Sequence, residues 1–162
     1  MLFRSLDRFF FKLKVVYPTE SAMHLILERT TQATTDTVER VVNAEEILQM
    51  RHAARLVPIA QPVQGYAIRL TLGTHPLSPY ATPMIKKYVR YGASPRAAQA
   101  LVLGAKIHAL TQGHAFVSPE NIRAIALPAL RHRLLLNFEG EAEQVDTDVM
   151  VKELLAGVSV DA

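Results

Sequence analysis

The stretch Tyr91-Gly92-Ala93-Ser94-Pro95-Arg96-Ala97 opens the clearest helix of this 162-residue chain. Ser94 can accept a hydrogen bond from a free backbone N–H of the first helical turn, and Pro95 suits the first helical position because it has no N–H to satisfy. We expect this helix to run to about Thr111, since Gly113 stands where helices commonly end.

Starting signals of the same kind predict that most of the remaining chain is helical. Three capping residues predict helices: Thr19 over 20–30, Asn43 over 44–55 and Asp146 from 147. Prolines near a first turn predict two more helices, Pro62 over 61–74 and Pro119 from 119. Pro128 is expected to interrupt the helix from 119 and to start another through Leu135.

Other segments are expected to be irregular or extended. The three prolines of residues 75–83 indicate a loop, and the alternating acids of residues 139–143 look like a solvated loop. Residues 86–90 are a short strand or a helical turn, and residues 37–42 a small strand or an extended connector.

Residues 9–17 alternate apolar and basic side chains before Pro18, a pattern that is typical of a strand. A strand is not stable by itself, so it should pair with a sheet. The expected fold is therefore mainly α, a helical bundle preceded by an orphan strand.

Composition and charge limit the classes of function. The chain has no cysteine, which excludes disulfides and thiolate zinc sites, and no apolar run approaches the roughly 18 residues of a membrane span. The net charge of +3 hides a basic centre, because residues 51–133 carry eleven Lys/Arg against the single acid Glu120. An anionic partner is indicated, and a basic helical module that binds nucleic acid is one alternative.

Few recognisable catalytic motifs are present. The six histidines show no metal-ligand spacing, so no metal site is expected, and there is no Gly-x-Ser-x-Gly elbow. The sequence also has no Gly-x-x-x-x-Gly-Lys-Ser/Thr loop for nucleotide phosphates. We therefore expect that the chain cannot hydrolyse a nucleotide alone, and whether it works as an enzyme is left open.

Two arginines are candidate functional residues. Arg96 is the second residue of its helix, where free N–H groups, the helix dipole and a guanidinium together suit a phosphate; the alternative is a solvent-facing arginine. Arg8 lies just before the expected strand and is either a surface arginine paired with Asp7 or an arginine finger.

Taken in order, these motifs resemble the C-terminal third of the MoxR family of AAA+ ATPases. The resemblance is carried by Leu6-Asp7-Arg8-Phe9 with Tyr17-Pro18, by the stretch around Ser94, by Val117-Ser118-Pro119-Glu120-Asn121-Ile122 and by Leu130-Arg131-His132-Arg133-Leu134. It covers nearly the whole chain, and the order and spacing of the motifs are more specific than any one of them.

Because the sequence has no membrane span and no signal-peptide cleavage site, a soluble, cytoplasmic protein is expected. The resemblance implies a helical lid that closes over ATP and couples hydrolysis to chaperone-like remodelling of proteins. Arg96 would be the second-sensor arginine, with Ser94 and Pro95 beside the nucleotide, and Arg8 the finger that reaches the ATP of an adjacent subunit. The partners implied are an AAA+ core that supplies Mg²⁺, full-length MoxR subunits in a ring, and proteins with von Willebrand factor A domains, but not nucleic acid.

The resemblance also implies boundaries. Residues 1–18 would be a remnant of an α/β core, residues 19–75 the first helices and a connector, and residues 76–162 the lid. Leu2-Phe3-Arg4-Ser5 stands where the family usually has Pro-Glu-Ala-Gln, so we expect a fragment or a split product. A non-catalytic protein-interaction domain is the remaining alternative.

Overall fold

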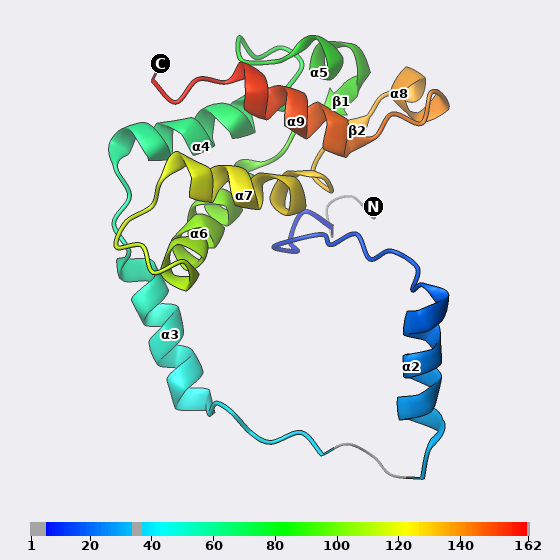
Figure 1. The fold of residues 1–162 in the computed structure, drawn as a ribbon. Coiled ribbons are helices and arrows are strands. Elements are labelled where there is room, and N and C mark those ends of the chain that lie inside the picture. Colours follow the sequence, from blue (N-terminus) through cyan, green and yellow to red (C-terminus); the bar gives the residue numbers. More distant parts are fainter. Residues whose placement is uncertain (1–5, 34–36, 162) are drawn as a thin grey trace. The chain divides into compact units, whose positions relative to one another are not determined.

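The computed structural model describes residues 6–33 and 37–161 (Figure 1). Its helices are α2 (Glu20–Thr31), α3 (Ala44–Leu56), α4 (Gln61–Gly73), α5 (Pro83–Tyr88), α6 (Pro95–Thr111), α7 (Pro119–Leu130), α8 (Phe138–Ala142) and α9 (Thr147–Gly157). Two short strands, β1 (Val89–Tyr91) and β2 (Leu135–Leu136), pair antiparallel, with Val89 opposite Leu136. The fold is mainly helical, as expected from the sequence.

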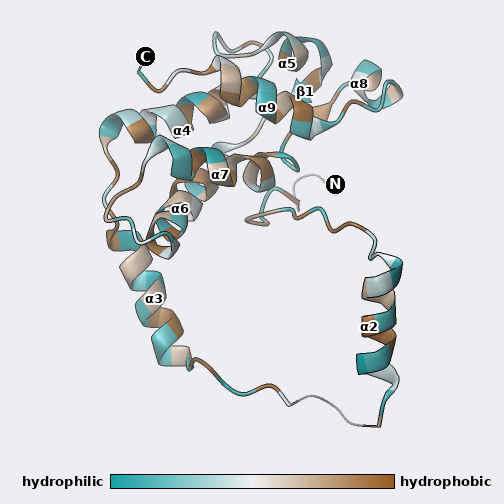
Figure 2. Cartoon of the chain, in the orientation of Figure 1, coloured by the Kyte–Doolittle hydropathy of each residue, from teal (hydrophilic) through white to brown (hydrophobic). Residues whose placement is uncertain are grey.

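The chain divides into two units, residues 1–12 with 52–162 and residues 13–51. The first unit holds the hydrophobic core, in which α6 packs against α7 and α4, and α9 packs against α7. The second unit contains α2, on which Figure 2 shows hydrophobic residues although none of its side chains is buried. No helix in the described ranges is long and apolar enough to cross a membrane.

The contact between α6 and α7 depends on small side chains. The buried face of α6 consists largely of alanine and glycine (Ala97, Ala100, Leu101, Gly104, Ala105, Ala109). A Cβ on Gly104 would lie 2.7 Å from Ile125 Cγ2 of α7, so the two helices approach closely at this point. Close packing at this point fixes α6 against α7 in the bundle.

The helix starts predicted from capping residues are confirmed. The side chains of Thr19, Ser94, Ser118 and Asp146 each accept a hydrogen bond from a first-turn N–H of the helix that follows. Asn43 and Glu46 exchange hydrogen bonds at the start of α3, 2.9 Å for the bond that the Asn43 side chain accepts. Gly113 has a φ of +72°, the left-handed conformation that glycine adopts without strain just after a helix.

The prediction of a strand at residues 9–17 is wrong, because these residues form neither a helix nor a strand in the structure. A strand needs a partner for its backbone groups. Here Lys12 N–H donates to Pro128 O of α7 (2.9 Å), and side chains of the bundle bind further carbonyls of the segment. Residues 37–42 likewise have no strand assignment, which leaves the extended connector of the two alternatives.

Three helix boundaries also differ from expectation. Helix α7 continues through Pro128 to Leu130, although Pro128 has no N–H to donate to the carbonyl four residues earlier. The helix expected through Leu135 is absent, since residues 135–136 pair with β1 instead. Helix α5 begins at Pro83 and gives way to β1, and part of the acidic stretch forms the short helix α8.

Candidate functional site

Arg96 lies in the first turn of α6, as predicted, and its side chain is 57% exposed. The Ser94 hydroxyl accepts a hydrogen bond from the backbone N–H of Arg96 (3.3 Å), with Pro95 between them at the first helical position. Arg96 Nη1 lies 3.2 Å from Asp7 Oδ2. A guanidinium therefore stands at the positive end of a 17-residue helix, held by one carboxylate.

The turn before α6 is fixed by the end of α4. Thr74 Oγ1 accepts a hydrogen bond from Ala93 N (2.8 Å), and His75 Nε2 lies 2.9 Å from Ala93 O. A Cβ on Gly92 would lie 2.6 Å from the backbone oxygen of Thr74, a distance that real Cβ atoms do not show. The glycine of the Gly92-Ala93-Ser94 stretch is thus required by a close backbone approach.

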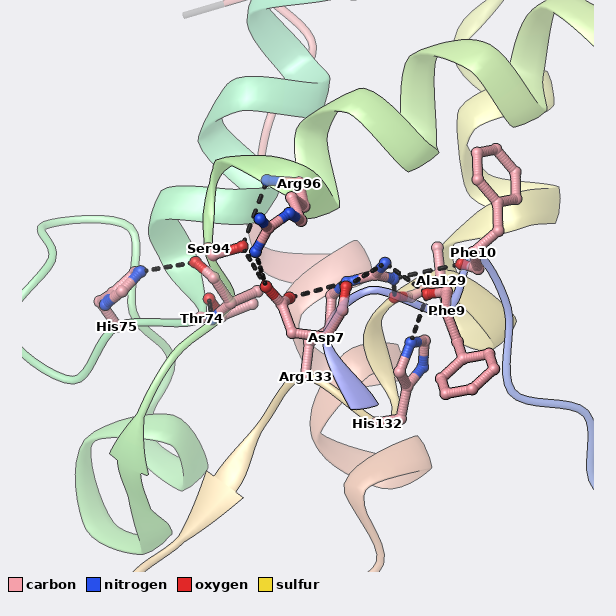
Figure 3. Close-up of polar contacts among 11 residues, drawn as sticks. Asp7, Phe9, Phe10, Thr74, His75, Ser94, Arg96, Ala129, His132 and Arg133 are labelled. Carbon is pink, nitrogen blue, oxygen red and sulfur yellow. Dashed lines mark hydrogen bonds and ion pairs between the residues drawn. The ribbon is translucent and has the colours of Figure 1, made fainter. Parts of the chain in front are cut away.

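Asp7 accepts hydrogen bonds from three side chains, which Figure 3 shows pointing toward it. Ser94 Oγ donates to Asp7 Oδ2 (2.8 Å), as does Arg96, and Arg133 Nε donates to Asp7 Oδ1 (3.2 Å). Burial raises the pKa of Asp7, but the hydrogen bonds from Ser94 and Arg96 and the charge of Arg133 outweigh it, so the pKa lies below its ordinary value. The carboxylate is therefore ionised wherever the protein is folded near neutral pH.

Arg133 is the most deeply buried charge of the site, with a side chain 2% exposed. Its guanidinium donates to Asp7 Oδ1 and to the backbone oxygens of Asp7, Phe9, Phe10 and Ala129. Burial lowers the pKa of Arg133, and the Asp7 charge opposes this. One side chain thus binds three backbone carbonyl groups of the N-terminal segment, those of Asp7, Phe9 and Phe10.

Sequence reasoning missed the roles of Asp7 and Arg133. Arg133 enters the sequence analysis only as part of the Leu130–Leu134 motif, where its signal is an arginine directly before the apolar run Leu134–Leu136. The partner of Arg133 is 126 residues away, a separation that no local pattern reports.

Arg8 is exposed and lies beside Arg96 on a depression of about 150 Å³, to which Asp7, Gln99 and Arg133 also contribute. Asp7 is paired with Arg96 and Arg133 rather than with Arg8. Within the part of the chain that the structure describes, Arg8 makes no hydrogen bond or ion pair. Three arginines and one carboxylate leave this depression with an excess of positive charge.

The residues of this depression suit phosphate oxygens and not a metal ion. Guanidinium groups and helical N–H groups are phosphate ligands, whereas Mg²⁺ requires carboxylate or carbonyl oxygens that are free to bind it. The one carboxylate present is already bound by two arginines. Across residues 6–33 and 37–161, no group of three or more potential metal-ligating side chains gathers at one place.

Comparison with known families defines the class of this domain. Residues 82–154, which include α6 and the Ser94–Arg96 turn, match the AAA lid domain. The AAA+ class implies nucleotide binding, and its members typically assemble as rings.

Comparison with individual proteins narrows the class to the MoxR type. The chain is 25% identical to Chaperone MoxR1 of Mycobacterium tuberculosis over 95% of its length, and 27% identical to the uncharacterised protein YeaC of Bacillus subtilis over 96%. It matches the crystal structure of a candidate ATPase from Cytophaga hutchinsonii with a TM-score of 0.89 and 29% identity over 97% of this chain. The chain is thus similar over nearly its whole length to proteins of the MoxR type of AAA+ ATPases, and its residues 82–154 match the AAA lid domain. It spans less than half of each of these proteins, 41%, 46% and 48% respectively.

Proposed function

We propose that this chain is the part of a MoxR-type AAA+ ATPase that closes over ATP and couples its hydrolysis to chaperone-like remodelling of proteins. The observation that carries the proposal is the exposed Arg96 guanidinium in the first turn of α6, next to Arg8 on a positively charged depression. A helix N-terminus and an arginine together form a favourable site for a terminal phosphate.

In this proposal Arg96 is the second-sensor arginine and contacts the γ-phosphate, with Ser94 and Pro95 shaping the turn beside it. Arg8 is the arginine finger that neutralises the transferring phosphate on an adjacent subunit of the ring. Its exposure and its lack of a partner among the described residues leave it available for this role. Mg²⁺ and the phosphate-cradling loop are supplied by an AAA+ core, and residues 1–162 alone do not hydrolyse ATP.

The basic centre of the chain does not support nucleic-acid binding as the main function. Several of its cations are engaged by acids, as in the pairs Arg133–Asp7, Arg131–Asp148 and Lys87–Glu139. Proteins with von Willebrand factor A domains are proposed as partners on the resemblance to the MoxR family alone.

A chimera tests the proposal. This chain would replace the part of Mycobacterium tuberculosis MoxR1 that it matches, and phosphate release from Mg-ATP would be measured. We expect Arg96→Ala and Arg8→Ala each to lower turnover by about 100-fold or more, as for other charge-stabilising side chains at transferring phosphates. Arg123→Ala is the matched control, because Arg123 is an exposed arginine of the same unit paired with Glu120.

Mixing the two variants separates the roles of the arginines. A ring assembled from Arg8→Ala and Arg96→Ala subunits contains some sites with an intact Arg96 and an intact neighbouring Arg8, roughly a quarter of them for random assembly. Recovery of about that fraction of activity supports action of Arg8 in trans. Turnover by Arg96→Ala equal to that of Arg123→Ala would remove the phosphate role.

A further inference from the structure

We propose that Asp7 and Arg133 form a positioning pair that holds the Arg96 side chain in place while leaving its positive charge available. The structural part of this inference stands on the contacts of four residues in one unit of the chain. The effect of this pair on ATP hydrolysis rests on the proposed function, in which Arg96 binds a phosphate.

The Asp7 carboxylate is divided between two arginines. Oδ1 faces Arg133 Nε at 3.2 Å, and Oδ2 faces Arg96 Nη1 at 3.2 Å and Ser94 Oγ at 2.8 Å (Figure 3). Among the residues that the structure describes, only one terminal nitrogen of the Arg96 guanidinium is bound, which leaves its other donors without a partner there. Asp7 therefore restricts the guanidinium without occupying it.

Arg133 determines where the carboxylate lies. It is itself fixed by backbone oxygens on both sides, those of Phe9 and Phe10 in the N-terminal segment and that of Ala129 in α7. A buried arginine with this many acceptors cannot turn without leaving carbonyl groups unpaired. The carboxylate that orients Arg96 is therefore anchored to the core of the bundle, even though Arg96 is more than half exposed.

Charge balance explains why two arginines share one carboxylate. An exposed arginine paired with a carboxylate of its own would be neutralised and would bind phosphate weakly. Because the Asp7 charge is balanced by buried Arg133, the group of three keeps one net positive charge, and the exposed member is Arg96. The pair thus orients Arg96 without cancelling its charge.

The same contacts position the neighbouring candidate residue. Arg133 also binds the backbone oxygen of Asp7, so the chain immediately before Arg8 is fixed by the group that fixes Arg96. The backbone next to Arg8 and the side chain of Arg96 are therefore both positioned by Arg133, directly for the first and through Asp7 for the second.

Nuclear magnetic resonance of the arginine side chains tests the inference on the full 162-residue chain. We expect the Nε–H groups of Arg133 and Arg96 to be ordered in the wild type, with order parameters above about 0.6, and that of Arg8 to be mobile. In Asp7→Asn, Arg96 should become as mobile as Arg8. Asp148→Asn is the matched control, because it removes the partner of Arg131 and should leave Arg96 unchanged.

Two results would overturn the inference: an Arg96 Nε–H as mobile as that of Arg8 in the wild type, or one that stays ordered in Asp7→Asn. If Asp7→Asn does not fold, the comparison of Arg96 with Arg8 in the wild type still decides the inference, because an Arg96 Nε–H as mobile as that of Arg8 overturns it. A purely structural ion pair would lower stability in Asp7→Asn without changing the order of Arg96.

Titration with inorganic triphosphate separates this inference from the proposed function. Chemical-shift changes at Arg96 in the wild type support both. An ordered Arg96 that is released in Asp7→Asn but does not respond to triphosphate supports the positioning pair and counts against the phosphate role.

Discussion

At the scale of single residues, His132 shows how the N-terminal segment is attached to the bundle. Its Nε2 lies 3.0 Å from Phe9 O and therefore donates, while its Nδ1 is buried without a partner in the described chain. Burial lowers the pKa of His132, the Phe9 carbonyl and Asp7 oppose this, and the charges of Arg133 and Lys12 add to it. The folded state therefore favours the neutral imidazole.

A pH dependence of stability follows from this shift. Because the pKa is lower in the folded state, the unfolded chain binds more protons once the pH falls below about 6.5, and the free energy of unfolding decreases by up to about 1.4 kcal/mol per pH unit. His132→Gln keeps a donor for Phe9 O and should flatten this decrease in urea unfolding between about pH 7.5 and 5. His114→Gln, at an exposed position, should retain it. Equal slopes in His132→Gln and the wild type would contradict the prediction.

Gly92 is a second residue whose identity affects the candidate site, because it allows the backbone before α6 to lie close to Thr74. Gly92→Ala places a methyl group 2.6 Å from the backbone oxygen of Thr74, so the turn before α6 has to shift. We expect a loss of stability of about 1–3 kcal/mol in thermal or urea unfolding. Gly157→Ala is the control, since its nearest neighbour would be 3.6 Å away and little change is expected.

At the scale of elements, the small buried residues of α6 set its distance from α7. Ala105, next to Gly104 in α6, is fully buried in the bundle. Ala105→Leu should cost about 1–3 kcal/mol, because a larger side chain forces neighbours off their preferred rotamers. Thr111→Leu, at an exposed position of the same helix, should change the free energy of unfolding by less than about 0.5 kcal/mol. Similar effects of the two substitutions would mean that α6 is not closely packed in the bundle.

At the scale of the whole molecule, the two units differ in how they are stabilised. Helix α2 has 12 residues and no buried side chain, and an isolated helix of this length is marginal in water. We expect native-state hydrogen exchange to show protection of α2 amides below about 1 kcal/mol, and protection of α7 amides close to the global free energy of unfolding. Equal protection in both helices would show that α2 is stabilised by contacts within the 162-residue chain.

Most helix starts could be predicted because the signals are local. A cap such as Ser94 or Ser118 binds an N–H two or three residues later, so the sequence pattern contains both partners. The strand expected at residues 9–17 and the helix through Leu135 could not be predicted correctly. The conformation of these segments depends on which distant group binds their backbone. The alternation or helical spacing of apolar residues in the sequence contains no information about that group.

The candidate site was partly predictable for the same reason. Arg96 at a helix start and Arg8 before an alternating segment are visible in the sequence, and the MoxR resemblance relates them to ATP. The role of the Asp7 carboxylate could not be predicted. Asp7 accepts hydrogen bonds from Ser94, Arg96 and Arg133, which lie 87 to 126 residues away in the sequence.

The sequence by itself therefore determined the helical class, the caps, and the place of Ser94, Pro95 and Arg96 at the start of α6. Only the tertiary structure decided that Arg133 is buried, that Asp7 is shared between two guanidinium groups, and that residues 7–12 bind the bundle rather than a sheet. The physical reason is that caps and turns are satisfied within a few residues. A buried charge is instead stabilised by whichever partners the packed core brings to it.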